Sequence, residues 1–458
     1  MASKSISGFP EWLPAGRLVE RHVVDTLRRV FELHSYQEIH TRAVEPLSEL
    51  LRKGETSKEV YLLRRLQDQD QGQSAELDES ALALHFDLTV PLARYVLQHQ
   101  NDLAFPFKRY QIQPVWRGER PQAGRFREFI QADADVIGRD TVPFHYEVEL
   151  PLVMARALTE LGLEIKVLVN NRKVAQGFYQ GIGLSDLDGV LREIDKLTKI
   201  GPAAVHESLV KQGATAAQAS ACLELASITA DAGPPVTAAV TELAGRVGVA
   251  GPAVATLEEG LTELGDLLDQ AAATLPGVFV AELKIARGLD YYTGSVYETA
   301  WVGHEDLGSI CSGGRYDSLA KDNRATYPGV GLSVGVSRLV SRLISQELIK
   351  PSRTVPAACL VAVINEAERP ASDKLANQFR DRGIPTDVAP TAAKLGKQIA
   401  HASKRGIPFM VFPEGQVKDL RTGQQVAADL ATWRPPAGDL TPQVGAATEP
   451  AGRRARPS

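Results

Sequence analysis

Side chains that could bind a charged substrate recur at every second position on both sides of a turn around 118–124. The residues that would share one face are Arg109, Gln111, Gln113 and Arg117 before the turn, and Arg127, Phe129, Gln131, Asp133 and Asp135 after it. Alternate side chains of a strand point the same way, so a hairpin here would present them on one polar floor. Arginine's planar fork binds phosphate oxygens, whereas Asp135 and Gln131 can accept from a protonated amine or an imidazole. With arginines at the turn end and acids at the far end, the pattern predicts a substrate with phosphate at one end and an ammonium group at the other.

The alternative is an ordinary antiparallel hairpin with one solvated face, since such sheets are common. Its opposite face would pack on a core, and the residues there are mainly apolar: Tyr110, Ile112, Trp116, Ile130, Ala132, Ala134 and Val136. A solvated face does not require basic and acidic residues to separate along the strand. The separation therefore favours a binding site.

A second candidate segment is ARGLDYYTGSVYE, residues 286–298. Arg287 alone could be a surface ion pair, which is worth roughly 0 to 1 kcal/mol. Its neighbours favour a site, because Gly288 and Gly294 allow close backbone approach. Tyr291 and Tyr292 would supply one ring to the core and one to a ligand.

Two further segments carry polar residues beside apolar runs. PGVGLSVGVSRL, residues 328–339, predicts a strand that leads into a helix with Arg338 in its first turn. A cation there opposes the helix dipole by about 0.3 to 1 kcal/mol, which indicates an anionic partner; the alternative is a pair with a nearby carboxylate. In HFDLTVPLAR, residues 85–94, Asp87 is typical of a helix N-cap, with Pro91 in the first turn.

Together these segments resemble the class II aminoacyl-tRNA synthetases, in the form of the histidyl-tRNA synthetases. WRGERPQAGRFREFIQADAD, residues 116–135, is similar to motif 2, residues 286–298 to the histidine signature, and residues 328–339 to motif 3. The resemblance implies an α+β fold: an antiparallel class II catalytic sheet with flanking helices, a helical insertion and a C-terminal α/β anticodon-binding domain.

The resemblance also implies roles for individual residues. Arg117 would contact the α-phosphate of ATP, Arg287 would stabilise charge there during attack, and Arg338 would contact the γ-phosphate. The loop residues Glu119, Arg120, Pro121 and Gln122 would approach ATP and the tRNA acceptor end. The histidine substrate would be bound by Asp87, Thr89, Gln131, Asp135, Tyr292 and Tyr316. Many members of the family have Glu where this chain has the shorter Asp135.

The activity implied is that of a histidine–tRNA ligase. L-Histidine and ATP would give histidyl-adenylate and pyrophosphate, and the histidyl group would then move to the 3′ end of its tRNA. The attacking carboxylate is already ionised at neutral pH, so the reaction needs positioning and positive charge, not a general base. Mg²⁺ would accompany ATP without a dedicated protein cage.

Motif 1 of the family, which builds a homodimer interface, is matched by a predicted amphipathic helix over 18–31 and a strand over 36–40. The usual proline after that strand is replaced by Arg42. A homodimer is expected, with no membrane and no DNA partner.

The chain divides by pattern into five parts. We expect a first catalytic part over 1–169, a helical insertion over 170–276, a second catalytic part over 277–350, an α/β anticodon-binding domain over 356–432, and a disordered tail over 433–458 rich in Pro, Gly, Ala and Arg. Within the fourth part, strands at 359–364, 384–388 and 408–412 alternate with helices at 372–382 and 392–404, which indicates a small parallel or mixed sheet. Gly383 and Gly406 would end the two helices. The acidic stretch within 67–80 is expected to be a surface loop.

Composition is consistent with a large cytoplasmic enzyme. The chain has 458 residues, 44% of them hydrophobic, and a net charge of −5, so no overall basic surface points to nucleic acid. Cys222, Cys311 and Cys359 are few, odd in number and widely spaced, which fits a reducing compartment. The sequence contains neither a CxxC nor an HExxH pattern, so we do not expect a zinc site.

Two other functions remain open. A catalytically silent paralogue that regulates ATP phosphoribosyltransferase would share the catalytic fold, but such subunits typically lack the C-terminal domain and have an eroded signature. A free-standing histidine sensor, related to the domain attached to stress kinases, is the second; the chain has no HRD or DFG kinase motif.

Overall fold

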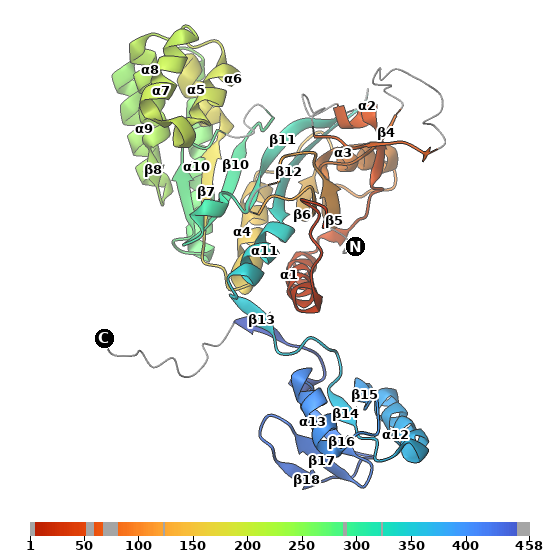
Figure 1. The fold of residues 1–458 in the computed structure, drawn as a ribbon. Helices are drawn as coiled ribbons and strands as arrows, with labels where there is room; N and C mark the ends of the chain where they lie inside the picture. The colour runs from red at the N-terminus through yellow and green to blue at the C-terminus, as the bar shows by residue number, and fades with distance from the viewer. Residues whose placement is uncertain are drawn as a thin grey trace, which may run out of the picture. The chain divides into compact units, whose positions relative to one another are not determined.

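The computed structural model describes residues 5–51, 59–66, 81–121, 124–286, 291–321 and 324–446 (Figure 1). Residue contacts divide the chain into two compact units. The first consists of Met1–Pro10 and Val24–Leu339, and the second of Glu11–Val23 and Val340–Ser458. Arg287, Gln122 and the acidic stretch 67–80 lie outside the described residues.

The first unit contains a nine-stranded sheet in the order β1-β5-β6-β12-β11-β10-β7-β9-β8. The strands are β1 (Gln37–Glu38), β5 (Phe107–Trp116), β6 (Glu128–Ile137), β7 (Ile165–Asn171), β8 (Thr229–Ala230), β9 (Phe279–Glu282), β10 (Ser295–Trp301), β11 (Cys311–Lys321) and β12 (Thr326–Gly335). Neighbouring strands are antiparallel except β1 with β5 and β7 with β9. The predicted α+β fold with an antiparallel catalytic sheet is confirmed.

The predicted hairpin is β5 and β6, and its register pairs Arg109 with Asp135 and Gln113 with Gln131. On the face that was predicted to pack on a core, Tyr110 and the alanines and valine of β6 are buried, whereas Ile112, Trp116 and Ile130 are half-buried. The Tyr110 ring lies 5.5 Å from that of Phe31 in α1 (Pro14–Leu33). Most of the polar face is buried as well: Arg117, Arg127 and Phe129 near the turn are half-buried, and the buried residues are Arg109, Gln111, Gln113, Gln131, Asp133 and Asp135. The alternative of a solvated face is therefore wrong.

Helices flank this sheet within the first unit. Helix α4 (His145–Glu160) packs on β6, β7 and β12, and α3 (Thr89–His99) packs on β11. The N-cap residue of α3 is Leu88 and not Asp87 as predicted, although the Asp87 carboxylate accepts from the Val90 N–H of the first turn at 3.1 Å. A small sheet and one short helix complete this part of the unit: β2 (Val44–Pro46), β3 (Leu62–Leu63), β4 (Leu82–Leu84) and α2 (Leu47–Leu50).

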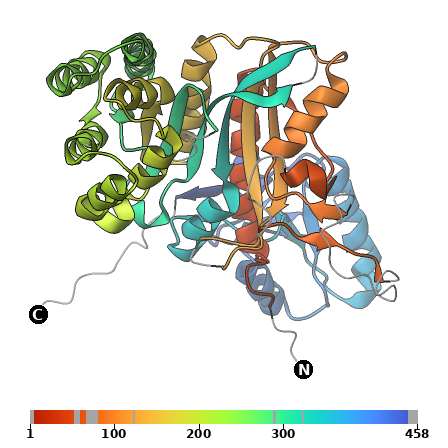
Figure 2. The ribbon, with the colours of Figure 1, turned by 90° about the horizontal axis from the view of Figure 1, so that it is seen from above.

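A group of helices is inserted between β7 and β9 and lies beside the β7–β9–β8 end of the sheet (Figures 1 and 2). It comprises α5 (Arg172–Gly181), α6 (Leu187–Ile194), α7 (Leu197–Lys211), α8 (Ala216–Ser227), α9 (Gly233–Val247) and α10 (Ala253–Thr274). Asn171 caps α5 by accepting from the Lys173 N–H at 2.9 Å. Helices α5 and α10 pack on each other, which gives the group its own interior.

The second unit contains a five-stranded sheet in the order β15-β14-β16-β17-β18. Its elements are α11 (Val336–Ser345), which begins in the first unit, β13 (Ile349–Pro351), β14 (Cys359–Val361), α12 (Arg369–Asp381), β15 (Thr386–Val388), α13 (Leu395–Lys404), β16 (Phe409–Phe412), β17 (Gln416–Asp419) and β18 (Gln425–Ala427). The first three strands in the sheet order are parallel and the others antiparallel, so the predicted mixed sheet is confirmed. Gly383 and Gly406 follow the two helices with φ of 76° and 74°, as expected of helix-ending glycines.

The prediction that the whole segment 433–458 is disordered is wrong for its first half. The Trp433 ring stacks on Phe379 at 5.8 Å and meets Phe409 at 5.4 Å. Strand β19 (Val444–Ala446) pairs with β13. Composition alone misjudged this segment because its partners come from much earlier in the chain. Residues 447–458 lie outside the described part.

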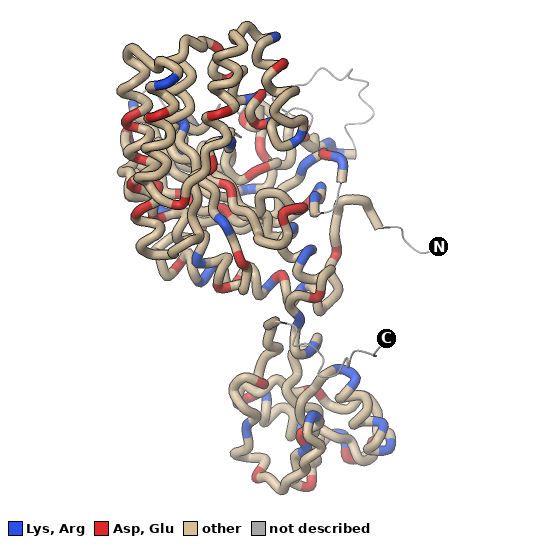
Figure 3. The backbone as a smooth tube through the Cα atoms, turned by 90° about the vertical axis from the view of Figure 1, so that its left-hand side faces the viewer, with Lys and Arg blue, Asp and Glu red and all other residues tan. Residues whose placement is uncertain are grey.

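No helix among the described residues is both long and apolar enough to cross a membrane. Cys222, Cys311 and Cys359 are free and buried. Acidic and basic positions are interspersed along both units (Figure 3), in keeping with the small net charge.

Candidate functional site

Two adjoining cavities lie over the centre of the nine-stranded sheet. The larger has a volume of about 220 Å³ and a mainly polar wall. Its lining residues are Arg117, Glu119, Gly124, Arg125, Phe126, Phe129, Gln131, Ser309, Ile310, Cys311, Ser312, Ser333, Gly335 and Arg338. Four of the predicted site residues therefore line one cavity: Arg117, Glu119, Gln131 and Arg338.

Arg117 is held in place by several contacts. Its guanidinium donates to the Phe86 carbonyl at 3.0 Å and to the Gln131 side-chain oxygen at 3.3 Å, and it lies 5.2 Å from the centre of the Phe129 ring. These contacts fix the direction of the planar guanidinium. Such a fixed cation suits a phosphate.

Arg338 lies in the first turn of α11, at the end of β12, as predicted. Its guanidinium donates to the carbonyl oxygens of Ser309 at 2.8 Å, and of Leu307 and Gly124 at 3.2 Å. These carbonyl oxygens orient the guanidinium. Arg338 therefore presents positive charge to the same cavity as Arg117.

Two predicted site residues of the loop after Arg117, Glu119 and Arg120, differ in whether they line the cavity. Glu119 lines the larger cavity and lies 3.9 Å from Arg125, while Arg120 is exposed. The positions predicted for Gln122 and Arg287 fall outside the described residues.

The smaller cavity, of about 40 Å³, is lined by Thr89, Asp133, Asp135, Tyr291, Tyr292, Ser312, Tyr316, Gly331, Leu332 and Ser333. The Tyr291 ring stacks on Tyr316 at 5.8 Å and meets Tyr292 edge-on at 5.2 Å. Both neighbouring tyrosines thus line the cavity, so the expected division into one core ring and one ligand ring is wrong. The cavity combines aromatic walls with carboxylates.

Asp135 is already engaged at the floor of the smaller cavity. It forms an ion pair with Arg109 at 2.6 Å, and the Tyr316 hydroxyl donates to it at 2.7 Å. Burial raises the pKa of Tyr316 well above its usual range, so this hydroxyl stays protonated and donates. Gly331 lies on the neighbouring strand, where a Cβ would come within 2.0 Å of the Asp135 carboxylate. Only glycine fits beside this carboxylate.

Asp133 was not among the nominated site residues, although it shares the strand face of Gln131 and Asp135. Burial raises the pKa of its carboxyl to about 6; nearby Arg109 opposes the shift and Asp135 adds to it. The Gln131 amide donates to it at 3.3 Å. Asp133 is thus a carboxylate that the fold makes costly to ionise.

A pH-dependent effect on stability follows from the raised pKa. A carboxyl whose pKa is raised in the folded state stabilises the fold below about pH 4, and this contribution is lost as the pH rises through about 6. The ionised group then costs about 3 kcal/mol. Asp133→Asn should therefore be more stable than the wild type above pH 6, by up to this amount, with no such advantage below about pH 4.

Urea unfolding of the two proteins across this pH range checks the prediction. Stability curves that stay parallel at every pH would show that Asp133 does not carry the effect.

The nominated residues thus divide between the cavities. Asp135, Thr89, Tyr292 and Tyr316 line the smaller one, whereas Gln131, also nominated for histidine, lines the larger. Among the described residues, Asp87 lines neither. Ser312 and Ser333 line both and were missed, because a serine within a strand has no distinctive signal.

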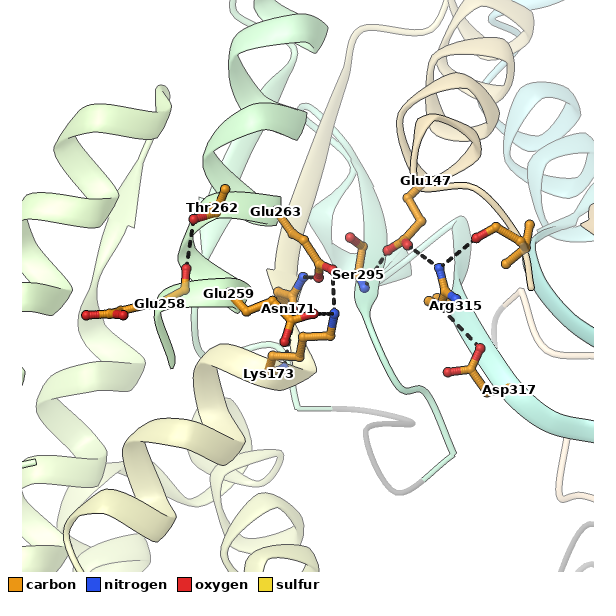
Figure 4. A network of polar contacts seen from close by, with 11 residues as sticks. Glu147, Asn171, Lys173, Glu258, Glu259, Thr262, Glu263, Ser295, Arg315 and Asp317 are labelled. Carbon is orange, nitrogen blue, oxygen red and sulfur yellow. Dashed lines mark hydrogen bonds and ion pairs between the residues drawn. The ribbon is translucent and has the colours of Figure 1, made fainter. Parts of the chain in front are cut away.

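A polar network supports β10 and β11, the second of which carries Tyr316 (Figure 4). Buried Glu147 of α4 accepts from Arg315 of β11 at 2.9 Å and from the Ser295 N–H of β10 at 3.0 Å. A Cβ at Gly294 would come within 2.9 Å of the Glu147 carboxylate, which explains this glycine of the predicted signature. The network thus ties α4 to β10 and β11.

A second part of the network lies at the base of the helical group (Figure 4). Lys173 of α5 pairs with Glu259 at 2.7 Å and with Glu263, both on α10, and Asn171 donates to Glu263 at 2.9 Å. Asn170 of β7 donates to the carbonyls of Leu283 at 3.2 Å and Ile285 at 2.8 Å. The segment that leads to Arg287 is thereby tied to the sheet.

Comparisons with known proteins agree with this geometry. A family model described as histidyl-tRNA synthetase matches residues 8–339, and one described as an anticodon binding domain matches residues 358–427. A histidine–tRNA ligase of Bifidobacterium longum subsp. infantis is 58% identical over 451 residues, covering 94% of this chain and 97% of its own. One of Micrococcus luteus is 52% identical, with 97% and 99% covered.

A solved histidyl-tRNA synthetase from Nostoc sp. PCC 7120 superposes with a TM-score of 0.82 at 35% identity, covering 94% of this chain and 98% of its own. Identity and coverage of this extent, together with the match of the family model over most of the chain, establish the relationship. The chain belongs to the histidyl-tRNA synthetase family.

Proposed function

We propose that the two adjoining cavities hold ATP and histidine while histidyl-adenylate forms. The protein is a histidine–tRNA ligase: it activates L-histidine with ATP, releases pyrophosphate, and transfers histidine to the 3′ end of its tRNA. The observation that carries this assignment is the division of charge, with fixed arginines in the larger cavity and carboxylates with tyrosines in the smaller. A nucleotide phosphate suits the first and a small cationic aromatic amino acid the second.

The arginines supply the electrostatic part of catalysis. Arg117 contacts the α-phosphate, Arg338 the γ-phosphate, and Arg287 stabilises the charge that develops at the α-phosphate. Positive charge fixed before the reaction begins lowers the barrier without reorganisation during the reaction. The carboxylate of histidine is the nucleophile and needs no base.

The smaller cavity recognises the amino acid. Asp135, oriented by Arg109 and Tyr316, accepts from the imidazole, and Tyr292 encloses the ring. Asp87 and Thr89 bind the amino group from the start of α3. Gln131, which lines the larger cavity, contacts histidine from the side of its carboxylate.

Mg²⁺ fits the larger cavity as a companion of ATP. Glu119 is a carboxylate in the lining, and Mg²⁺ is usually held by one or two carboxylates together with substrate phosphates and water. No group of three or more metal-binding side chains occurs among the described residues, so Glu119 would act with the phosphates. The ion would neutralise phosphate charge during the reaction.

The alternatives have less support. A silent regulatory subunit has no need of two arginines oriented in a phosphate-sized polar cavity, as Arg117 and Arg338 are. A histidine sensor has no need of an anticodon-binding domain, which the family model matches at 358–427.

The other parts of the chain serve tRNA and assembly. The helical group, residues 170–276, contacts the acceptor arm; residues 356–432 read the anticodon; and residues 1–169 with 277–350 form the catalytic body. A homodimer forms through α1 and β1, and β1 is an edge strand of the sheet. Arg42, at the position of the usual proline, pairs with buried Glu45 at 2.8 Å, so it has a local structural partner. The enzyme is cytoplasmic, a location supported by its similarity to bacterial histidine–tRNA ligases.

Removal of the chain after Gln346 should separate the two reaction steps. The cut removes β13 together with its partner β19, and it removes the five-stranded sheet with its own core. Histidine-dependent pyrophosphate exchange should persist, while the KM for tRNA should rise in charging assays. The exposed residues Lys394, Lys397 and Lys404 would contact phosphates, so the lost affinity should be salt-dependent. An unchanged KM for tRNA at all salt concentrations would contradict anticodon reading by this domain.

Aminoacylation tests the function as a whole. The full chain, ATP, Mg²⁺, labelled histidine and its tRNA should give acid-precipitable, base-labile histidyl-tRNA. Adenylate formation without any transfer to tRNA would contradict the ligase assignment.

A further inference from the structure

The two cavities meet at a pair of serines. Ser312 of β11 and Ser333 of β12 line both cavities and face each other across the two strands. Ser333 is also the cross-strand neighbour of Asp133 on β6, and its hydroxyl hydrogen-bonds to the Asp133 carboxylate. Asp133 therefore lies at the junction between the cavities.

The order of the polar residues along β6 indicates which part of histidine would lie at this junction. Gln131 lines the larger cavity, Asp133 lies at the junction, and Asp135 lies at the floor of the smaller cavity. If histidine places its carboxylate toward ATP and its ring beside Asp135, its α-carbon and ammonium group must lie between them. We propose that Asp133 accepts a hydrogen bond from the α-ammonium of histidine and selects for an amino acid that carries it. This inference rests on the proposed function.

Negative charge exceeds positive charge among the described groups around Asp133, so one more cation would be stabilised there. The groups that act on it are Arg109 on β5, Asp135 on β6, Asp87 before α3, Tyr292 in the segment before β10, and Cys311 on β11. Arg109 is fully buried and pairs with Asp135. Among the described residues it is the cation that acts on Asp133, so one cation faces the two carboxylates of β6. An ammonium group would balance the second carboxylate.

Asp87 is less well placed than Asp133 to bind the α-ammonium group by itself. One of its oxygens accepts from the Val90 N–H, and the side chain lines neither cavity within the described part of the chain. Asp133 is the carboxylate that borders the smaller cavity beside the serine pair. It would share the ammonium with Asp87 and Thr89.

A pair of ligands tests the assignment on the full chain. L-Histidine and imidazole-4-propionate share the ring and the carboxylate, but the second lacks the amino group. Asp133→Asn should raise the Kd for histidine about 10- to 100-fold, as loss of one charge-assisted hydrogen bond does, and leave that for imidazole-4-propionate within about threefold. Asp135→Asn, the matched control on the same strand face, should weaken both ligands, because both carry the ring.

Equal weakening of both ligands by Asp133→Asn, or no effect on either, would overturn the assignment. A wild-type chain that binds ATP but not histidine would instead overturn the proposed function.

The wild-type protein alone provides a second test should the variant not fold. The pKa of Asp133 near 6 means that the group carries a proton in about half of the empty sites at that pH. Binding of the ammonium should expel it. Calorimetry in buffers of different ionisation enthalpy should detect more proton release with histidine than with imidazole-4-propionate. Each value is first corrected for the ring proton that the free ligand carries at the working pH, because the α-ammonium of histidine lowers the pKa of its own ring. Equal proton release would contradict the role of Asp133.

Discussion

Arg117→Ala is expected to lower the rate of histidyl-adenylate formation by about 10² to 10³, as the loss of one preorganised charged donor does. The guanidinium is fixed by the Phe86 carbonyl, the Gln131 side chain and the Phe129 ring, so its charge faces the larger cavity before ATP arrives. Arg117→Lys should restore little, because an ammonium is a point charge that cannot reproduce the planar fork. Single-turnover formation of the adenylate measures the effect.

A matched control for this variant is Arg246→Ala. Arg246 is an exposed arginine in the helical group that pairs with Glu224, and surface pairs of this kind contribute roughly 0 to 1 kcal/mol. The control should form adenylate at the wild-type rate. A near-normal rate in Arg117→Ala would exclude the assigned role.

The second large effect is expected at the floor of the smaller cavity. Asp135→Ala leaves Arg109 fully buried without its ion-pair partner, a change that typically costs about 3 to 5 kcal/mol. The same variant should raise the KM for histidine much more than the KM for ATP if Asp135 accepts from the imidazole, as proposed. Urea unfolding and pyrophosphate exchange measure the two effects separately.

A double variant distinguishes the structural role of Asp135 from its role in binding. Arg109→Leu combined with Asp135→Leu removes both charges, and well-packed apolar replacements of buried ion pairs are often neutral in stability. The double variant should recover much of the lost stability while the KM for histidine stays high. A double variant with a wild-type KM would show that Asp135 only pairs with Arg109.

Much of the site could be predicted because strand and helix periods place residues reliably. The period of two put Gln131, Asp133 and Asp135 on one face of β6, and the change from strand to helix located Arg338. The hydrogen bond that Asp87 accepts from the first turn of α3 was predictable for a similar reason, since a short acceptor before a helix satisfies a free N–H, although the N-cap position itself is Leu88.

Burial of the polar face could not be predicted from the same pattern. Alternation shows that two faces differ, but it does not show whether solvent or another layer of the protein covers the polar one. The sequence also indicated that arginines gather at the turn end. The register instead places Arg109 opposite Asp135 at the far end, where it balances a carboxylate in the interior.

Contacts between segments that are far apart in the sequence could not be predicted either. The pairing of β13 with β19 and the packing of Trp433 on Phe379 join parts of the chain whose compositions do not indicate a partner. The two cavities meet at Ser312 and Ser333 because the strand order places β6, β12 and β11 side by side, and this order could not be predicted from the sequence. Such pairings become visible only in the folded sheet.

The most direct test of the central claim is ATP–pyrophosphate exchange with the full chain, measured separately with each proteinogenic amino acid. Exchange requires that ATP and the correct amino acid occupy the two cavities together and react, and it does not depend on tRNA. We expect exchange with L-histidine and only background with the others. Exchange that depends on another amino acid, or no exchange with any of them, would contradict the account.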